Sequence, residues 1–464
     1  MTKISPLTRI GPAARALLAL LAGALLLALA APTASAATAP EGGRGQDRGH
    51  GSAHGNGHGN GHGNGHGPNG GWVGTWSTTV TTVPASENNA FEDQTIRQVV
   101  HTSIAGEALT LTLSNEFGTT PLVLGEVHVA RRAADGSGSA ILPGTDRQVT
   151  FGGERGITIP TGATALSDPV ALRLPAATDL VISLYLPEYT PATTVQAFSM
   201  SETYLAEGNV TGARELTASG TSDRWYFLRG VAVRPEPGAR ARAVVAFGDS
   251  ITAQSSVGTN HRWSDYLAAR LRAAHGLPDV GVLNQGVSGN RLLHDPNPPA
   301  GSPAEAYATL FGENGLARFD RDVLAQPGVE SVIVLLGIND IGQPGTEVAP
   351  ASERVDAGQI IQGYRQLIAR AHAHGVRVFG GTLGPFEDNT LGFHSPENEA
   401  ERQAVNAWVR TSGAFDGVID FDAALRDPDH PGRLRPAFDS GDHLHPNDAG
   451  NEAMAAAVPL RLFR

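Results

Sequence analysis

Residues 72–233 consist of short runs in which apolar and polar residues alternate, the pattern of strands that bury one face. Gly, Pro, Asp and Asn occupy the gaps between the runs, and no stretch with helical periodicity interrupts them. The predicted strands cover residues 95–104, 108–113, 122–130, 147–151, 170–174, 179–186 and 226–233. This spacing favours an all-β domain built as a sandwich of two sheets.

After Arg242 the pattern changes to strands that alternate with helices. Apolar runs predict buried strands over residues 243–247, 280–284, 331–336, 377–383 and 418–421. Helices are predicted over residues 263–275, 304–324, 352–374 and 397–411, with a last one from Asn447. Such alternation is typical of a parallel sheet with helices on both faces. We therefore expect a β-sandwich domain over residues 72–236 and an α/β domain over residues 237–464.

The first 36 residues have the pattern of a secretory signal peptide. Its parts are a cationic start, an apolar run and a small-residue cleavage site, carried by Lys3, Arg9 and Arg15, by residues 16–31, and by Ala34-Ser35-Ala36. We expect cleavage after Ala36 and a secreted, extracellular protein. No later run approaches about 18 consecutive apolar residues, so we expect no stable membrane anchor; a retained N-terminal anchor is the alternative.

The next segment, residues 37–71, is dominated by Gly, His and Asn and cannot bury a core. Five histidines are spaced four residues apart: His50, His54, His58, His62 and His66. We interpret the segment as a disordered linker. A loose metal-binding or pH-responsive tail is the functional alternative, although the glycines impose no geometry on the imidazoles.

Composition excludes several classes of function. The chain has no cysteine, which removes thiol nucleophiles, thiolate metal sites and disulfides. Its only lysine is Lys3, so the mature chain can form no Schiff base and has no Walker lysine or Ser-Lys dyad. Removing the three signal cations changes the net charge from -12 to about -15, which argues against nucleic acid as a partner.

Four short segments in the second half of the chain carry candidate chemistry. They are G-D-S-I-T (248–252), G-V-S-G-N (286–290), G-I-N-D (337–340) and D-H-L-H (442–445). The first three follow predicted parallel strands, and ligands bind beyond the carboxyl ends of such strands. Together they contain what acyl transfer needs, namely a nucleophile, oxyanion donors and a carboxylate-oriented imidazole.

Ser250 is the candidate nucleophile, at a sharp turn from a strand into a helix. Its backbone N–H can also join an oxyanion hole. The structural alternative is an N-cap, the commonest use of serine at the start of a helix. The turn differs from the G-x-S-x-G elbow, because Thr252 stands where the second glycine would be.

Two further oxyanion donors are candidates. Gly289 lacks a Cβ, so its N–H can approach a developing oxyanion directly; alternatively, the glycine marks only a turn with positive φ. Asn339 can donate through its side-chain amide, or it can be an ordinary turn residue after a buried strand.

Asp442 and His445 lie three residues apart in a loop, where one turn can bring them together. The carboxylate would then fix the tautomer of the imidazole base. His443 is the competing base, but it is adjacent to Asp442 and we prefer His445. We expect Asp249 and Asp340 to hold loops through backbone hydrogen bonds rather than to join the triad.

Four aromatic residues of the β domain have two interpretations. Trp72, Trp76, Trp225 and Tyr226 could form a platform on which sugars stack. Aromatic residues in strands are more often core, and we favour that interpretation.

The four segments resemble the blocks of the SGNH hydrolases, also called GDSL esterases, which contribute Ser, Gly, Asn and a D-x-x-H pair. Residues 260–271 and 442–450 resemble in particular a secreted actinobacterial branch that includes acetylxylan-esterase-like proteins. That branch also has a strand-rich N-terminal region opening with W-x-G-T-W, as at residues 72–76. The resemblance covers most of residues 72–464.

The resemblance implies a flavodoxin-like three-layer catalytic domain that uses no metal or other cofactor. Ser250 would attack an ester carbonyl, His445 would take its proton and Asp442 would stabilise the imidazolium. The N–H groups of Ser250 and Gly289 and the Asn339 amide would bind the oxyanion.

The expected function is a secreted serine esterase acting on short acyl esters, such as acetyl esters, of carbohydrates, with a small-molecule or polysaccharide ester as its partner. One alternative is a lipase or lysophospholipase acting on longer acyl chains, and another is a non-catalytic polysaccharide-binding protein. A nucleotide-binding flavodoxin-like protein is disfavoured, since no G-x-G-x-x-G follows a strand. We expect loops 292–307 and 386–396 to shape the substrate pocket.

Overall fold

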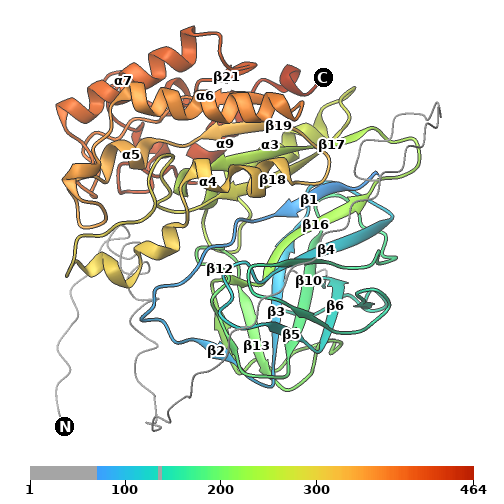
Figure 1. The fold of residues 1–464 in the computed structure, drawn as a ribbon. Helices are drawn as coiled ribbons and strands as arrows, with labels where there is room; N and C mark the ends of the chain where they lie inside the picture. Colours follow the sequence, from blue (N-terminus) through green and yellow to red (C-terminus); the bar gives the residue numbers. More distant parts are fainter. Residues whose placement is uncertain (1–70, 134–137) are drawn as a thin grey trace, which may run out of the picture. The chain divides into compact units, whose positions relative to one another are not determined.

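The computed structural model describes residues 71–133 and 138–464. The predicted signal segment (1–36) and almost all of the linker (37–71) lie outside the described residues, so the expectations for them stay predictions. Residues Gly71–Arg464 form one compact unit. Within it we call residues 71–234 the β region and residues 241–464 the α/β region (Figure 1).

The β region contains two large antiparallel sheets, as the alternating pattern predicts. One has the strand order β1-β16-β4-β9, with the bounds Val73–Ser77, Leu228–Arg234, Ala108–Ser114 and Thr164–Leu166. The other has the order β14-β13-β3-β10-β6-β7, with the bounds Gly220–Ser222, Thr203–Glu207, Gln94–His101, Asp179–Leu186, Glu126–Arg131 and Arg147–Val149. Side chains from both sheets join one buried cluster, including Leu111 of the first and Ile182 of the second.

Three short strand pairs complete the β region: β5 (Leu122–Leu124) with β8 (Ile157–Ile159), β11 (Thr190–Pro191) with β2 (Ala90–Phe91), and β12 (Val195–Gln196) with β15 (Trp225–Tyr226).

The prediction of a strand over residues 170–174 was wrong. Only its ends form isolated bridges, Val170 with Leu109 and Leu174 with Gly106. Pro169 and Pro175 flank the segment and have no N–H to donate to a ladder, which accounts for its short pairing.

The α/β region contains a five-stranded parallel sheet with the order β18-β17-β19-β20-β21. The strands have the bounds Asp279–Gly286, Ala241–Gly248, Val329–Leu335, Arg377–Gly381 and Gly417–Ile419. Numbered along the chain this is 2-1-3-4-5, the order of the flavodoxin-like doubly wound fold. The predicted fold class is therefore confirmed.

Helices cover both faces of this sheet. A Cβ added to Gly380 would lie 2.5 Å from the Phe415 ring, and one added to the next residue, Gly381, would lie 2.8 Å from the Phe421 ring. Successive side chains of a strand point to opposite faces, so these two rings lie on opposite sides. Phe415 packs with Tyr364 of α6 (Ala357–Ala373), whereas Phe421 packs with Trp263 of α3 (Trp263–Ala273).

The remaining helices follow the same division. Helix α7 (Pro396–Thr411) packs against α6, and α9 (Asp448–Ala457) packs against α3 (Figure 1). Helix α8 (Phe421–Leu425) contacts α9, and two short helices, α2 (Ser250–Ala253) and α5 (Ile338–Gly342), follow β17 and β19. Within the described residues, 71–133 and 138–464, no helix is both long enough and apolar enough to cross a membrane.

The predicted helix over residues 304–324 was wrong as a continuous element. It is divided into 3-10 turns (Pro303–Ala306 and Ala308–Phe311), the α-helix α4 (Gly315–Phe319) and a π-helical turn, η3 (Asp320–Leu324). Gly312 breaks it with a φ of +68°, and Asn314 starts α4 by accepting a hydrogen bond from the Ala317 N–H.

Strand β1 of the β region packs along β18. The Gly74 N–H donates to the Pro327 carbonyl at 2.8 Å, and a Cβ on Gly281 would lie only 2.0 Å from the Gly74 oxygen. Trp76, Trp225 and Tyr226 are buried, and the two tryptophan rings meet edge to face at 4.9 Å. Those three residues are therefore core rather than a sugar platform.

Candidate active site

The first three motifs meet at one edge of the parallel sheet. Strand β17 lies between β18 and β19, and Gly248 at its end is opposite Gly286 and Leu335. The loops carrying Ser250, Gly289 and Asn339 therefore leave neighbouring strands side by side, as strand order and motif position predict.

Ser250 begins helix α2 directly after β17. The N-cap is Asp249, whose Oδ1 accepts a hydrogen bond from the Ile251 N–H at 3.0 Å. Asp249, and not Ser250, is therefore the N-cap of α2. The Ser250 hydroxyl can bind another partner. Its Oγ lies 2.7 Å from Nε2 of His445.

His445 and Asp442 form an oriented pair in the loop before α9. Oδ2 of Asp442 lies 2.5 Å from Nδ1 of His445, and Oδ1 accepts the backbone N–H groups of Leu444 and His445 at 3.0 and 2.8 Å. Because the carboxylate accepts a hydrogen bond from the Nδ1–H group, Nε2 of the neutral ring carries no proton and can accept a hydrogen bond from the Ser250 hydroxyl. A single hydrogen-bonded chain thus joins Asp442, His445 and Ser250.

Burial and the interaction between Asp442 and His445 shift the pKa values of both residues. Burial alone would lower the pKa of His445, but the hydrogen bond to Asp442 and its charge raise that pKa above 6.5. Burial would likewise raise the pKa of Asp442, yet the hydrogen bond with His445 and its charge hold it well below its usual range. Each partner stabilises the charged form of the other, which is what a base that must become an imidazolium requires.

The competing histidine has another partner. Nδ1 of His443 lies 2.5 Å from Oδ2 of Asp439, and the His443 side chain is 48% exposed. Its backbone φ is +62°, a left-handed conformation. The structure therefore places His445, and not His443, against Ser250.

Gly289 has a φ of +73° and is partly exposed. Among the described residues, no acceptor receives a hydrogen bond from its backbone N–H, while its carbonyl accepts one from Nε2 of Gln343 at 2.8 Å. A Cβ at this position would lie 2.4 Å from the ring of Phe311. Both the turn and the ring require glycine here, and the N–H stays available to a ligand.

Asn339 lies in the first turn of α5 and is 3% exposed. Its amide donates to the Asn290 carbonyl at 3.0 Å. A primary amide has two N–H donors, so the second can serve a ligand. Among the described residues, no hydrogen bond joins Gly289 or Asn339 directly to Ser250, His445 or Asp442. Adjacent strands bring the two groups to one edge of the sheet.

The two remaining motif aspartates hold loops, as predicted. Asp340 accepts the N–H groups of Leu292 and Leu293 at 2.7 and 2.9 Å, and Asp249 caps α2. Burial raises the pKa of Asp249 to about 7 and that of Asp340 to about 6.

Both loops expected to shape the substrate pocket contact the site. Asp340 holds the start of loop 292–307, and in loop 386–396 the Thr390 N–H donates to the Asp442 carbonyl at 3.1 Å. In the described part of the chain, no group of three or more His, Asp or Glu side chains could hold a metal ion.

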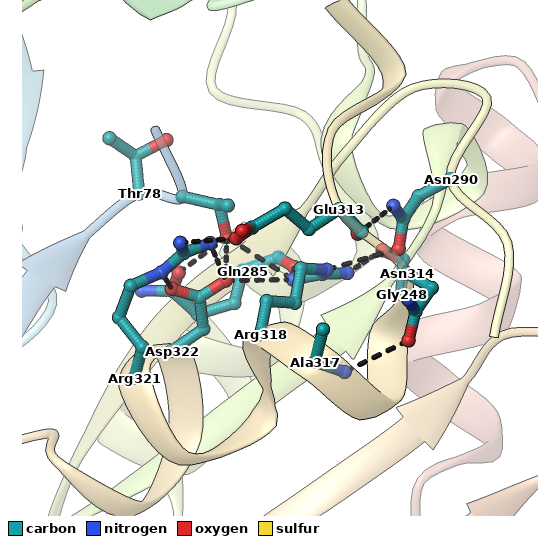
Figure 2. A network of polar contacts seen from close by, with 12 residues as sticks. Thr78, Gly248, Gln285, Asn290, Glu313, Asn314, Ala317, Arg318, Arg321 and Asp322 are labelled. Carbon is teal, nitrogen blue, oxygen red and sulfur yellow. Dashed lines mark hydrogen bonds and ion pairs between the residues drawn. The ribbon is translucent and has the colours of Figure 1, made fainter. Parts of the chain in front are cut away.

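Sequence reasoning missed several residues that support the site. Asn290 binds Asn339 through its carbonyl, and the buried Arg318 donates to Oδ1 of Asn290 at 3.0 Å (Figure 2). Asn290 stands inside the G-V-S-G-N motif and could have been noticed there. Arg318 and Phe311 carry no local signal, since both lie in what the periodicity predicts to be one helix.

Comparison with known proteins agrees with this geometry. A family model described as GDSL-like lipase/acylhydrolase matches residues 246–453, which include Ser250, Gly289, Asn339, Asp442 and His445. Among curated proteins, none matches the chain.

Three solved structures are among those similar to this chain. A putative lipolytic protein of the G-D-S-L family from Desulfitobacterium hafniense is 18% identical, with 46% of this chain and 96% of that chain covered and a TM-score of 0.33. A catalytic mutant of an acetylxylan esterase from Geobacillus stearothermophilus is 21% identical, with 48% and 94% covered and a TM-score of 0.35. A carbohydrate acetylesterase family member from Sinorhizobium meliloti is 15% identical, with 47% and 94% covered and a TM-score of 0.34.

The family match spans the loops in which the candidate nucleophile, the candidate base and both candidate oxyanion donors lie. Residues 246–453 therefore form a domain of the GDSL-like lipase/acylhydrolase family, and the protein is a carboxylic ester hydrolase.

Proposed function

We propose that the protein is a secreted serine esterase that works through an acyl-enzyme and acts on short acyl esters of carbohydrates. The observation that carries the mechanism is the chain from Asp442 Oδ2 to His445 Nδ1 at 2.5 Å and from His445 Nε2 to Ser250 Oγ at 2.7 Å. These two contacts support a mechanism in which Ser250 is the nucleophile, His445 the base and Asp442 the orienting carboxylate.

In the first half of the reaction, Oγ of Ser250 attacks the ester carbonyl carbon and its proton passes to Nε2 of His445. Asp442 stabilises the resulting imidazolium. The tetrahedral oxyanion is bound by the N–H groups of Ser250 and Gly289 and by the free N–H of the Asn339 amide. When the intermediate collapses, the alcohol leaves with the proton from Nε2 and the acyl group stays on Ser250.

In the second half, His445 takes a proton from water, and the resulting hydroxide attacks the acyl-serine carbonyl. The same donors bind the second oxyanion. Collapse breaks the bond to Oγ of Ser250, which regains the proton held by His445, and the carboxylic acid is released.

The proposed substrate class is supported by the surroundings of Gly289. The Phe311 ring lies against this glycine, and the Tyr307 ring packs on Phe311 at 5.8 Å. Both side chains are partly exposed, and the Tyr307 hydroxyl donates to Oε1 of Glu347 at 2.6 Å. The apolar C–H face of a sugar ring packs well on such aromatic rings, which supports a carbohydrate ester as the substrate.

The proposal of export rests on the sequence of residues 1–36. Expression in a secreting host should yield a mature protein whose N-terminal residue is Ala37. An intact Met1 on protein recovered from the medium would contradict cleavage, and retention in the membrane fraction would favour an uncleaved anchor.

The test of function is hydrolysis of nitrophenyl esters from acetyl to palmitoyl, alongside acetate release from acetylated xylo-oligosaccharides. Ser250→Ala should leave the fold intact and abolish both activities. Full activity in the folded variant would refute the mechanism. A rate that is highest for acetyl, with acetate released from the oligosaccharides, supports the proposed substrate. A maximum at long chains would replace it with a lipase, and no cleavage at all would favour a polysaccharide-binding role.

A further inference from the structure

A buried arginine lies beneath the catalytic loops. Arg318 of α4 is 1% exposed, and its guanidinium donates to three different segments of the chain. The acceptors are the Gly248 carbonyl at 2.9 Å, the Gln285 carbonyl at 2.9 Å and Oδ1 of Asn290 at 3.0 Å (Figure 2). These acceptors stand at the end of β17, at the end of β18 and directly after Gly289.

The charge of Arg318 is balanced by an equally buried carboxylate. Oδ2 of Asp322, in η3, lies 3.2 Å from Nη1 of Arg318, and both side chains are fully buried. Arg321 binds the other oxygen of Asp322 at 2.9 Å. A buried guanidinium needs such pairing, and its planar fork then holds its acceptors in a fixed arrangement.

Asn290 connects this ion pair to the candidate oxyanion donors. Its Oδ1 accepts from Arg318, its amide donates to the carbonyls of Phe311 and Glu313 at 2.8 Å each, and its carbonyl accepts from the Asn339 amide at 3.0 Å. The side chain and backbone of one residue therefore set both the orientation of Asn339 and the loop that follows Gly289.

The β region reaches the same network. Thr79 donates from Oγ1 to Oε1 of Gln285 at 2.6 Å and lies 3.1 Å from Oδ2 of Asp322. Arg229 of β16 lies 3.5 Å from Oδ1 of Asp322. Gln196 of β12 donates to the Gly286 carbonyl at 3.3 Å. Thus three residues of the β region bind to the supports of the catalytic loops.

We propose that Arg318 is a positioning residue for the oxyanion hole, and that the β region holds it in place through Thr79 and Asp322. The β region then forms part of the catalytic apparatus, rather than an independent appendage. This inference rests on the proposed roles of Gly289 and Asn339 as oxyanion donors. Small displacements of such donors are costly, because they must match an oxyanion within a few tenths of an ångström.

The experiment compares two buried arginines replaced by lysine. Arg318→Lys keeps the charge but cannot reach all three acceptors, and we expect kcat to fall on the order of 10- to 100-fold with KM changed less than about 3-fold. Arg402→Lys is the matched control. Arg402 is also fully buried, and among the described residues its guanidinium donates to Asp422, Glu399 and the Leu383 carbonyl rather than to the loops that carry Ser250, Gly289 or Asn339. The control should lose stability but keep its kcat.

A second measurement asks whether Arg318 acts through Asn339. Asn339→Ala should cost on the order of 100-fold in kcat by itself. If Arg318 positions that amide, Arg318→Lys should cost less than about 3-fold in the Asn339→Ala background. Equal losses in both backgrounds would overturn the proposal, as would an unchanged kcat for folded Arg318→Lys.

A milder change tests the contribution of the β region. Thr79→Val removes one hydroxyl and should lower kcat about 3- to 10-fold with KM nearly constant, through displacement of the loop supports. Thr203→Val is the control, because Thr203 is equally buried in the β region and its hydroxyl donates to the Arg224 carbonyl rather than to the Arg318 network.

If Arg318→Lys fails to fold, Thr79→Val provides the test. An unchanged kcat of Thr79→Val would then overturn the inference. Activity that survives in Ser250→Ala would instead refute the proposed function. An inactive Ser250→Ala together with a fully active, folded Arg318→Lys refutes only the positioning role.

Discussion

Replacing Gly289 by alanine tests the candidate oxyanion hole at the point where the structure leaves least room. The substitution keeps the backbone N–H, so a loss of activity must come from moving this N–H or the ring of Phe311 beside it. Two obstacles oppose the new methyl group, a φ of +73° and the ring of Phe311, whose atoms would lie 2.4 to 2.5 Å from the Cβ.

The two obstacles have separate costs. The left-handed conformation disfavours alanine by about 1 to 2 kcal/mol. Forcing the ring or the loop away adds about 1 to 3 kcal/mol, the usual range for overpacking. We therefore expect Gly289→Ala to lower the free energy of unfolding by about 2 to 5 kcal/mol. A displaced N–H should also lower kcat on the order of 100-fold.

The assay combines urea unfolding with kcat on a nitrophenyl acetate substrate, for Gly289→Ala, Phe311→Ala and the double variant. Without the ring, Gly289→Ala should cost only the conformational part, about 1 to 2 kcal/mol. A cost that is the same with and without Phe311 would refute the steric argument. A Gly289→Ala variant that is both stable and fully active would refute the assignment of this turn to the oxyanion hole.

Three further predictions follow from the pKa shifts and contacts. Asp442→Asn should lower kcat roughly 10,000-fold and move the acid limb of kcat/KM to lower pH, because the carboxylate that raises the pKa of His445 is gone; an unmoved limb in the pH profile would contradict this. His443→Gln should change kcat less than about 3-fold, since its partner is Asp439, and a loss comparable to that of a His445→Gln variant would reverse the assignment of the base. Asp249→Asn should stabilise the protein more at pH 8 than at pH 5. Burial raises the pKa of Asp249 to about 7, above its value in the unfolded chain. The protonated carboxyl therefore contributes its full stabilisation below about pH 4, and this contribution is lost as the pH rises through 7. Equal differences in melting temperature between variant and native protein at both pH values would contradict this.

Much of the site is local in sequence, and for that reason it could be predicted. Apolar runs located β17, β18 and β19, and the residues just after them had to meet at one rim because parallel strands end at the same edge. The spacing of Asp442 and His445 allowed their pairing within one turn. Some elements were predicted wrongly, because Gly312 interrupts the predicted helix over residues 304–324, and Pro169 and Pro175 limit the pairing of the predicted strand over residues 170–174.

The supports of the site could not be predicted from the sequence. Arg318 lies 70 residues from Gly248 and 239 residues from Thr79 along the chain, yet it contacts both. The aromatic ring beside Gly289 is that of Phe311, from a segment that periodicity predicts as helix. Trp76 and Trp225, which the sequence offered as a sugar platform, pack in the core.

The sequence by itself therefore determined the α/β fold, the candidate nucleophile, base and carboxylate, and the turns that carry the oxyanion donors. Only the tertiary structure decided which buried charge holds those turns and which ring stands against them. The physical reason is that hydrophobic period and turn chemistry act over a few neighbouring residues. A desolvated ion pair, in contrast, is stable only where partners from distant segments satisfy all of its hydrogen bonds at once.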